Sequence, residues 1–297
     1  MYTHQRFNTF CQYASPFDVQ NLSFQRVALL LLSSYALQWS ARRSDMRLYD
    51  SILQEVLKAP DGVVDNLIIG WKGSFLSLSD GRWGVGSTPP EGGEPMSPRE
   101  EHTRNILMSG AHSLSRLLVS PYPQEFSAAS AALTALAPAP EGGEPLEFLL
   151  QLPGRDRVAL LAPDPWVTDF LRDWNWKISI FDDSRRGLGI LPEWTTSQHL
   201  HSSTVLWINA ETLRNRRILS LMPLLKGKRG VILQGPGIPF LPSVFREASI
   251  THLVLPAAEE AAAPETRRYI SAGGTPWTCP SLRWRVFPLL YTDEENR

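Results

Sequence analysis

Cysteine, long apolar runs and an excess of either charge are all scarce in this chain of 297 residues. The two cysteines, Cys11 and Cys279, lie far apart, which excludes a disulfide framework and favours a reducing cytoplasm. The 29 basic and 30 acidic side chains leave a formal charge of −1, so the composition lacks the basic excess typical of nucleic-acid-binding proteins. We therefore expect neither a disulfide-stabilised secreted domain nor a nucleic-acid partner.

The one long apolar run covers residues 27–37. A helix needs about 20 apolar residues to cross a bilayer, so this run is too short for a membrane span. It is also a poor signal peptide, because Asp18 lies in the polar region before it and no small-x-small cleavage site follows. We expect a cytoplasmic protein that is not inserted in a membrane, with residues 1–45 as an N-terminal extension and Met46 as an alternative start.

Familiar catalytic and metal-binding motifs are missing as well. We find no Gly-x-Ser-x-Gly motif, no paired carboxylates and no Cys/His nucleophile arrangement. His199 and His201 form the one close histidine pair, and no third Cys, His or carboxylate completes a metal site at a recognisable spacing. The segment Ala162–Pro165 also lacks the glycines of a dinucleotide-binding loop, and its two prolines remove two amide donors. The sequence therefore does not predict classical NAD binding.

Short apolar runs recur at a steady interval in the C-terminal half, and each is bounded by Pro, Gly, Asp or Asn. The runs are Val158–Ala162, Ile178–Phe181, Val205–Ile208, Val231–Leu233 and Leu253–Leu255. Predicted helices separate most of them, at Trp166–Asp173, at Glu211–Leu225 and from Pro264 to Gly273. This rhythm predicts an α/β fold, with a Rossmann-like parallel sheet over residues 147–297 and a final strand near Trp284–Leu290.

Residues 46–140 show a different pattern and predict a smaller α+β domain. Apolar residues from Tyr49 to Leu57 follow one face of a helix. Three strands are expected at 63–69, 74–79 and 83–86, with a hairpin turn at Asp80-Gly81, and helices at 101–119 and 124–136. The proline- and glycine-rich segment 137–145 predicts the domain boundary. Its Pro-Glu-Gly-Gly-Glu-Pro sequence also occurs at 90–95, which we interpret as two loops of similar composition.

The strongest candidate for a ligand-binding loop follows the fourth apolar run. Parallel sheets bind ligands at the carboxyl ends of their strands. Gly235 and Gly237 would let a ligand approach the backbone closely, while Pro236 and Pro239 stiffen the turn. The alternative is a tight connection between a strand and a helix.

Polar residues follow two other runs at the same predicted edge. Asp182 and Asp183 end the second strand, where an acidic residue often binds a ribose hydroxyl. Arg185 and Arg186 come next and would either meet a phosphate or pair with these acids. Asn209 ends the third strand and would either cap the next helix or point into the same crevice.

Five segments in a characteristic order carry a family resemblance. They are Val64–Trp71, Gly84–Pro89, Ser120–Glu125, Val158–Leu161 and Gly235–Pro242. From Leu48 to Leu290 the chain resembles prokaryotic proteins that join an enolase-N-like domain of the DUF4213 type to a Rossmann-like DUF364 domain labelled "putative heavy-metal chelation". The resemblance implies a cleft between two domains, with a small molecule, a metal ion or a metal chelate as ligand. The chain departs from the family at Ser120–Pro123, where a Ser-x-Asn-Pro pattern is typical.

Three functional hypotheses remain at this point. The leading one is a cytoplasmic protein that binds a small ligand or a metal complex in the interdomain cleft, against Gly235–Pro239. The alternative is an enzyme that acts on a nucleotide-like substrate such as S-adenosylmethionine, with Asp182 or Asp183 on the ribose. The third is a scaffold that uses some of its ten tryptophans at an interface. The sequence leaves open whether the chain forms a homo-oligomer and whether it is an enzyme.

Overall fold

The computed structural model describes residues 47–88, 106, 109–152, 157–185, 187, 189–257 and 260–289. Residues Leu48–Arg297 belong to one compact unit. The predicted extension 1–45 with its apolar run, the copy of the repeat at 90–95, and Arg186 lie outside the described residues. Among the described helices, none combines the length and the apolar character that a membrane span requires.

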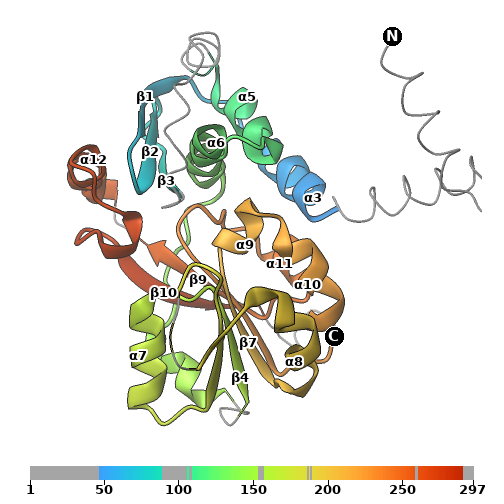
Figure 1. The fold of residues 1–297 in the computed structure, drawn as a ribbon. Coiled ribbons are helices and arrows are strands. Elements are labelled where there is room, and N and C mark those ends of the chain that lie inside the picture. The colour runs from blue at the N-terminus through green and yellow to red at the C-terminus, as the bar shows by residue number, and fades with distance from the viewer. Residues whose placement is uncertain are drawn as a thin grey trace, which may run out of the picture. The chain divides into compact units, whose positions relative to one another are not determined.

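The N-terminal part, residues 47–136, is a three-stranded antiparallel sheet with helices beside it (Figure 1). Its elements are α3 (Arg47–Val56), β1 (Val64–Ile69), β2 (Gly73–Leu78), β3 (Trp83–Ser87), α5 (Ala111–Ser115), the 3-10 turn η2 (Arg116–Val119) and α6 (Pro123–Leu136). The helix expected from Tyr49 to Leu57, the three strands with the hairpin at Asp80-Gly81, and the helix expected at 124–136 are present as α3, β1–β3 and α6. Residues 137–145 connect this part to the second sheet, and the division into two domains stays a prediction.

Helix α6 lies unusually close to strand β3. Ten of its 14 residues are buried, and most of these are alanine or serine. A Cβ atom on Gly84 would overlap Thr134 Oγ1 and the carbonyl of Ala131, and a Cβ on Gly86 would overlap Ser130 Oγ. Small residues on both elements thus let the helix approach the strand backbone closely.

The C-terminal part, residues 144–289, is built on a seven-stranded sheet. The strands are β4 (Val158–Leu161), β5 (Ile178–Phe181), β6 (Ile190–Leu191), β7 (Val205–Asn209), β8 (Gly230–Gln234), β9 (His252–Ala257) and β10 (Arg283–Pro288). The helices are α7 (Pro165–Asp173), α8 (Thr196–His199), α9 (Glu211–Arg214), α10 (Arg217–Leu225), α11 (Pro242–Glu247) and α12 (Ala263–Ser271). Short 3-10 turns are η3 (Leu146–Gln151), η4 (Glu193–Thr195), η5 (Leu200–Ser202), η6 (Glu260–Ala262) and η7 (Pro276–Thr278).

The strand order is β10-β9-β8-β7-β4-β5-β6, and the pairs from β9 to β6 are all parallel. The predicted Rossmann-like parallel sheet is thus confirmed at the level of a mostly parallel α/β sheet. The final strand, β10, pairs antiparallel with β9, and the short edge strand β6 has no counterpart in the sequence prediction. Because the five predicted strands run the same way, their carboxyl ends meet at one edge.

Helices cover both faces of this sheet. Figure 1 shows α7 on one side and α8, α10 and α11 on the other. Under α7, apolar side chains from the strands form a core around Leu160, Trp207 and Val254. Helix α12 lies instead against the N-terminal sheet, where Ile270 packs on Phe75 and Val85 (Figure 1). Helix α12 therefore packs on β1 and β2, on the face of the N-terminal sheet opposite α6 (Figure 1).

Two local predictions need correction. The expected helix 211–225 is broken into α9 and α10, because Asn215 accepts a hydrogen bond from the amide of Arg217 and Arg216 takes a left-handed conformation with φ 59°. Helix periodicity alone did not reveal the break, since the apolar residues continue through it. The expected helix 101–119 is also interrupted: residues 101–105, 107 and 108 lie outside the described residues, Ala111–Ser115 form α5, and Arg116–Val119 form the 3-10 turn η2.

Replacing Gly84 with alanine should destabilise the protein strongly. The new Cβ would overlap atoms of α6 that belong to the backbone and cannot move independently. We expect a loss of about 3 kcal/mol in the free energy of unfolding, measured by urea denaturation. Gly187→Ala is the matched control, because its Cβ would have Ile190 Cδ1 as nearest neighbour at 3.5 Å, and a change below about 1 kcal/mol is expected there. Equal effects of the two substitutions would contradict this account of α6.

His252 should make the protein acid-sensitive. The side chain is 1 % exposed, and burial lowers its pKa from 6.5 to about 4. The folded protein therefore keeps this imidazole neutral, while the unfolded chain takes up a proton as the pH falls below about 6.5. When the pH falls from about 7 to about 5, the free energy of unfolding of the parent protein should decrease. We expect this decrease to be about 2 kcal/mol larger than the decrease in the His252→Gln variant. Identical pH dependences would contradict the burial argument.

Candidate functional site

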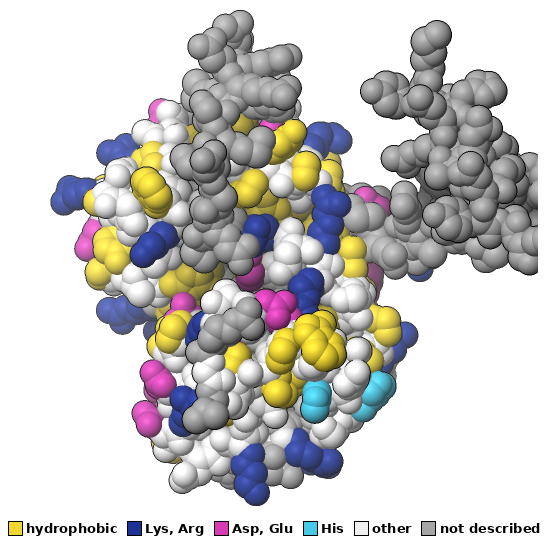
Figure 2. Space-filling view, in the orientation of Figure 1, with side chains coloured by type: hydrophobic (Ala, Val, Ile, Leu, Met, Phe, Trp, Pro, Cys, Tyr) yellow, Lys and Arg dark blue, Asp and Glu magenta, His cyan; other side chains and the backbone are white. Residues whose placement is uncertain are grey.

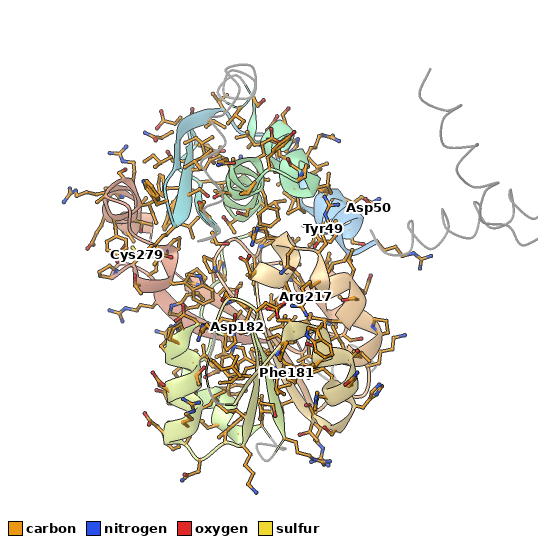
Figure 3. The ribbon with its side chains drawn as sticks, in the orientation of Figure 1. Tyr49, Asp50, Phe181, Asp182, Arg217 and Cys279 are labelled. Atoms are coloured by element: carbon orange, nitrogen blue, oxygen red, sulfur yellow. The ribbon has the colours of Figure 1, made fainter. Side chains whose placement is uncertain are left out.

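The predicted site residues follow β5, β7 and β8 and therefore lie at the carboxyl edge of the sheet. Figure 3 labels Asp182 at this edge, directly after Phe181 and below the N-terminal part. The connections reverse direction between β4 and β7, which makes the ends of these two strands the switch point of the sheet. Ala162, the residue after β4, has a left-handed φ of 46°, which is a strained conformation for alanine.

The loop Gly235–Pro239 is packed against other parts of the protein. A Cβ on Gly235 would overlap the Cβ of Ala210, and a Cβ on Gly237 would lie 3.0 Å from that of Ser130 in α6. Gly237 also has a left-handed φ of 82°, which glycine adopts without strain. Pro236 and Pro239 are buried. The two glycines therefore permit close contact between this loop, the sheet and α6.

Asp182 is part of an internal polar network. Its side chain is 2 % exposed; one oxygen accepts hydrogen bonds from the amide of Ser184 at 2.8 Å and from its hydroxyl, and the other lies 3.1 Å from Arg185 Nε. Arg185 also donates to the carbonyl of Pro163. Of the two roles open to Arg185, pairing with the acid is the one observed. This pairing ties the loop after β5 to the loop after β4.

Asp183 faces a second polar group at the same edge. Its carboxylate accepts a hydrogen bond of 2.8 Å from the amide of Glu193, and Glu193 in turn pairs with Arg217. Burial lowers the pKa of the Arg217 guanidinium, and the negative charge of Asp183 opposes that shift. Figure 3 labels Arg217 near Asp182, which places both networks at one edge of the sheet.

Asn209 caps the helix that follows it. Its Oδ1 accepts a hydrogen bond of 2.9 Å from the amide of Glu211, as the helix-cap alternative predicts. Its register partner Gln234 is 1 % exposed and accepts a hydrogen bond from Trp207 Nε1 through Oε1. Gln234 Nε2 is buried without a hydrogen-bond partner among the described residues.

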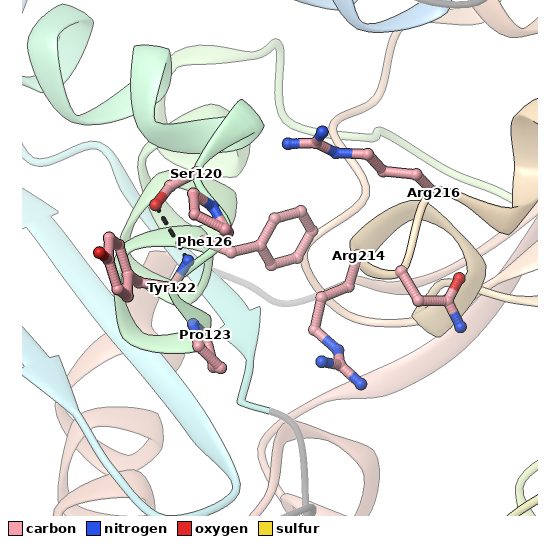
Figure 4. Close-up of a pocket in the computed structure, with 8 residues that line it drawn as sticks. Ser120, Tyr122, Pro123, Phe126, Arg214 and Arg216 are labelled. Atoms are coloured by element: carbon pink, nitrogen blue, oxygen red, sulfur yellow. Dashed lines mark hydrogen bonds between the residues drawn. The ribbon is translucent and has the colours of Figure 1, made fainter. Parts of the chain in front are cut away.

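A pocket lies between the N-terminal end of α6 and the turn that joins α9 to α10 (Figure 4). Its volume is about 230 Å³, and its lining residues are Ser120, Pro121, Tyr122, Pro123, Phe126, Arg214, Asn215 and Arg216. One wall thus belongs to the N-terminal part and the other to the C-terminal part. None of the seven predicted site residues is among the described residues that line this pocket.

Two arginines supply the charge of this pocket. Arg214 pairs with Glu211, one turn earlier in α9, and Arg216 donates to the carbonyl of Val119 in the N-terminal part. No lining residue is acidic. The start of α6 adds partial positive charge, which the carboxylate of Glu125 in its first turn offsets in part. The arrangement favours a ligand that carries negative charge.

Arg216 is held where it is by its backbone and its surroundings. A left-handed residue with a side chain costs roughly 1–2 kcal/mol, so other contacts must maintain this conformation. Tyr49, which is fully buried in α3, donates a hydrogen bond to the carbonyl of Leu213 in α9. Burial raises the pKa of Tyr49 above its usual range, and Arg216 opposes that rise. Helix α3 therefore supports the turn that carries the arginine.

Sequence analysis missed Arg214 and Arg216 as site residues. Both lie inside a segment that was predicted to be one continuous helix, and a continuous helix would not bring them together, because residues two apart point to different sides. The sequence did single out the opposite wall of the pocket, because Ser120–Glu125 is one of the five segments that carry the family resemblance. The position of Tyr122 in the pocket coincides with the departure from the family pattern.

The strain at Arg216 can be measured by comparing two substitutions. Arg216→Gly and Arg216→Ala both remove the guanidinium, but only alanine keeps a Cβ in the left-handed conformation. We expect the glycine variant to have a free energy of unfolding about 1 kcal/mol higher than the alanine variant in urea denaturation. An alanine variant that equals or exceeds the glycine variant would show that the turn relaxes without cost.

Comparison with known proteins links the C-terminal part to one family. Residues 144–279 match the DUF364 family, described as "Putative heavy-metal chelation". No curated protein matches the chain. The predicted DUF364 resemblance is therefore confirmed over this part, whereas the enolase-like, DUF4213-type N-terminal domain stays a prediction.

Two solved structures have a similar fold. A DUF364-family protein from Desulfitobacterium hafniense DCB-2 superposes with a TM-score of 0.69 at 18% identity, covering 83% of this chain and 98% of that one. A DUF364-family protein from Pyrococcus horikoshii gives a TM-score of 0.65 at 14% identity, covering 82% of this chain and 99% of that one. At these identities the comparisons establish the fold, and the C-terminal part of this chain is similar in sequence to the DUF364 family.

Proposed function

We propose that the protein binds a small anionic ligand, including an anionic metal chelate, in the pocket between α6 and the α9–α10 turn. The observation that carries the proposal is the placement of Arg214 and Arg216 across from Ser120 and Tyr122, with no acidic residue in the lining. Figure 4 shows these side chains on opposite walls. The function is binding, and the DUF364 likeness supplies the metal-chelate ligand class.

The walls of the pocket combine charge with hydrogen-bonding and apolar groups. Guanidinium groups bind carboxylates and phosphates through paired hydrogen bonds. The hydroxyl of Ser120 donates to the carboxylate of Glu125, so it is available to a ligand as an acceptor, and Phe126 supplies an apolar base that is 6 % exposed. A volume of about 230 Å³ accommodates a compact molecule with a few carboxylates rather than a large cofactor.

A bare metal ion does not suit these residues. Among the described residues, no group of three or more His, Cys, Asp or Glu side chains is arranged to hold one. Two arginines in the lining would repel a free cation. A metal already bound by a polycarboxylate carries the opposite charge, so the chelate, rather than the protein, would supply the metal ligands.

The loop Gly235–Pro239 supports the pocket in this proposal. It contacts Ser130 in α6 through Gly237 and Ala210, next to α9, through Gly235. The two walls of the pocket are therefore both positioned against this loop. The nucleotide hypothesis stays a prediction. It requires Asp182 to bind a ribose hydroxyl, and both carboxylate oxygens of Asp182 already interact with protein groups.

Isothermal titration with citrate, nickel citrate and nickel chloride tests the proposal. We expect the two anionic probes to bind and nickel chloride to bind more weakly. The Arg214→Gln/Arg216→Gly double variant should bind the anionic probes about tenfold or more weakly, since each charged hydrogen bond contributes about 1.5–3 kcal/mol.

Arg267→Gln/Arg268→Gln is the matched control, because both arginines are exposed on α12 and outside the pocket lining. This control removes the same charge and should bind like the parent protein. Unchanged affinity in the pocket variant, or tighter binding of nickel chloride than of nickel citrate, would refute the proposed site. Absence of binding by all three probes to the folded protein would count against it as well.

A further inference from the structure

A second hollow lies at the opposite edge of the parallel sheet, where the strands begin. Its lining comes from the residues that precede β4, β7 and β8 and from the end of α10. They are Arg157, His201, Ser202, Ser203, Thr204, Pro223, Leu224, Lys226, Gly227, Lys228 and Arg229. The volume is about 410 Å³, which falls within the usual range for small-ligand sites. No part of the pocket between α6 and the α9–α10 turn contributes to it.

The charge of this hollow has one sign. Among the lining residues that the structure describes, four are Lys or Arg and none is Asp or Glu. Figure 2 shows Lys and Arg side chains, in dark blue, at the lower end of the molecule, where β4 and β7 begin. Lys226 and Arg229 are exposed, and neither forms an ion pair with a described residue. Because the chain as a whole is nearly neutral, this concentration of cations is local.

Lys228 connects two of the loops that form the hollow. Its Nζ donates hydrogen bonds to the carbonyls of Leu200 at 2.5 Å and Ser203 at 2.7 Å, which ties the loop before β8 to the loop before β7. An ammonium group has three donors, so one remains beyond these two bonds. Burial lowers the pKa of Lys228, and the nearby cation Arg157 lowers it further. A bound anion would stabilise the charged form of Lys228 and offset the repulsion between Lys228 and Arg157.

The backbone also leaves room for a ligand. Gly227 has a left-handed φ of 76°, and a Cβ placed there would meet nothing within 4 Å. The space above this turn is therefore open. Ser202, Ser203 and Thr204 line the same hollow from the β7 side. The hydroxyls of Ser202 and Thr204 donate to the carbonyls of His199 and Arg157, whereas a serine hydroxyl such as that of Ser203 is of the kind that donates to phosphate oxygens.

We propose that this hollow is a binding site for a small polyphosphorylated molecule, held by Lys226, Lys228 and Arg229. Several cations, with no acidic residue among the described residues of the lining, match a ligand that carries several negative charges on adjacent phosphates. The site is a concave hollow formed by neighbouring loops of one sheet edge. A nucleic-acid surface instead requires a basic stripe along a helix or an extended face.

Isothermal titration of the full-length protein with inorganic tripolyphosphate tests this site. We expect binding at about 50 mM NaCl that weakens markedly at about 300 mM, because salt screens exposed charges. The Lys226→Glu/Arg229→Glu variant should bind tripolyphosphate about tenfold or more weakly, since two attractive contacts become repulsive. The same variant should bind nickel citrate like the parent protein, which separates this site from the one between α6 and the α9–α10 turn.

Arg267→Glu/Arg268→Glu on α12 is the matched control, because it changes the net charge equally at an exposed position outside the hollow. Retained tripolyphosphate binding in this control supports the site, and equal losses in both variants would show a non-specific charge effect and overturn it. Unchanged binding in the Lys226→Glu/Arg229→Glu variant, or no binding to the parent protein, overturns it too. Tighter binding of a single-stranded oligonucleotide that displaces tripolyphosphate would reassign the surface to nucleic acid. If the glutamate variant fails to fold, Lys226→Gln/Arg229→Gln gives the same readout.

Discussion

The close approach of α6 to β3 is the constraint on which the arrangement of this protein depends. Gly84 and Gly86 leave no side chain between the strand and the helix, and alanines and serines on α6 complete the contact. The same helix presents Ser130 to Gly237 in the loop after β8. Ser130 on this one helix therefore lies against both β3 of the N-terminal sheet and the loop at the carboxyl edge of the parallel sheet. Because protein interiors are packed this densely, a shift of one element displaces the elements that contact it.

That constraint also determines what the carboxyl edge can offer a ligand. The predicted loop Gly235–Pro239 is used for packing, and Asp182, Asp183 and Asn209 bond to neighbouring loops and amides. The open space is displaced to the N-terminal end of α6, where the α9–α10 turn brings two arginines to face it. A strained residue, Arg216, lines this space, and strained backbone is common at binding sites.

The two hollows of the protein differ in origin. The pocket beside α6 exists because two parts of the chain meet, and its residues are separated by about ninety positions in the sequence. The basic hollow belongs to the amino edge of one sheet and is formed by successive loops before β4, β7 and β8. We propose anionic ligands for both, a compact polycarboxylate for the first and a molecule with several phosphates for the second. Their separation at opposite edges of the sheet lets each be tested without the other.

Hydrophobic patterning and turn residues determined the parallel strands, the hairpin at Asp80-Gly81 and the helix after β4, because each depends on neighbours in the chain. It also placed Asp182, Asn209 and Gly235 at one edge, since parallel strands end together. Only the tertiary structure decided that Gly237 packs on Ser130 and that the helix after β7 breaks at Arg216. It also decided that Arg216 faces Ser120. These outcomes depend on contacts between segments far apart in sequence, which local periodicity cannot register.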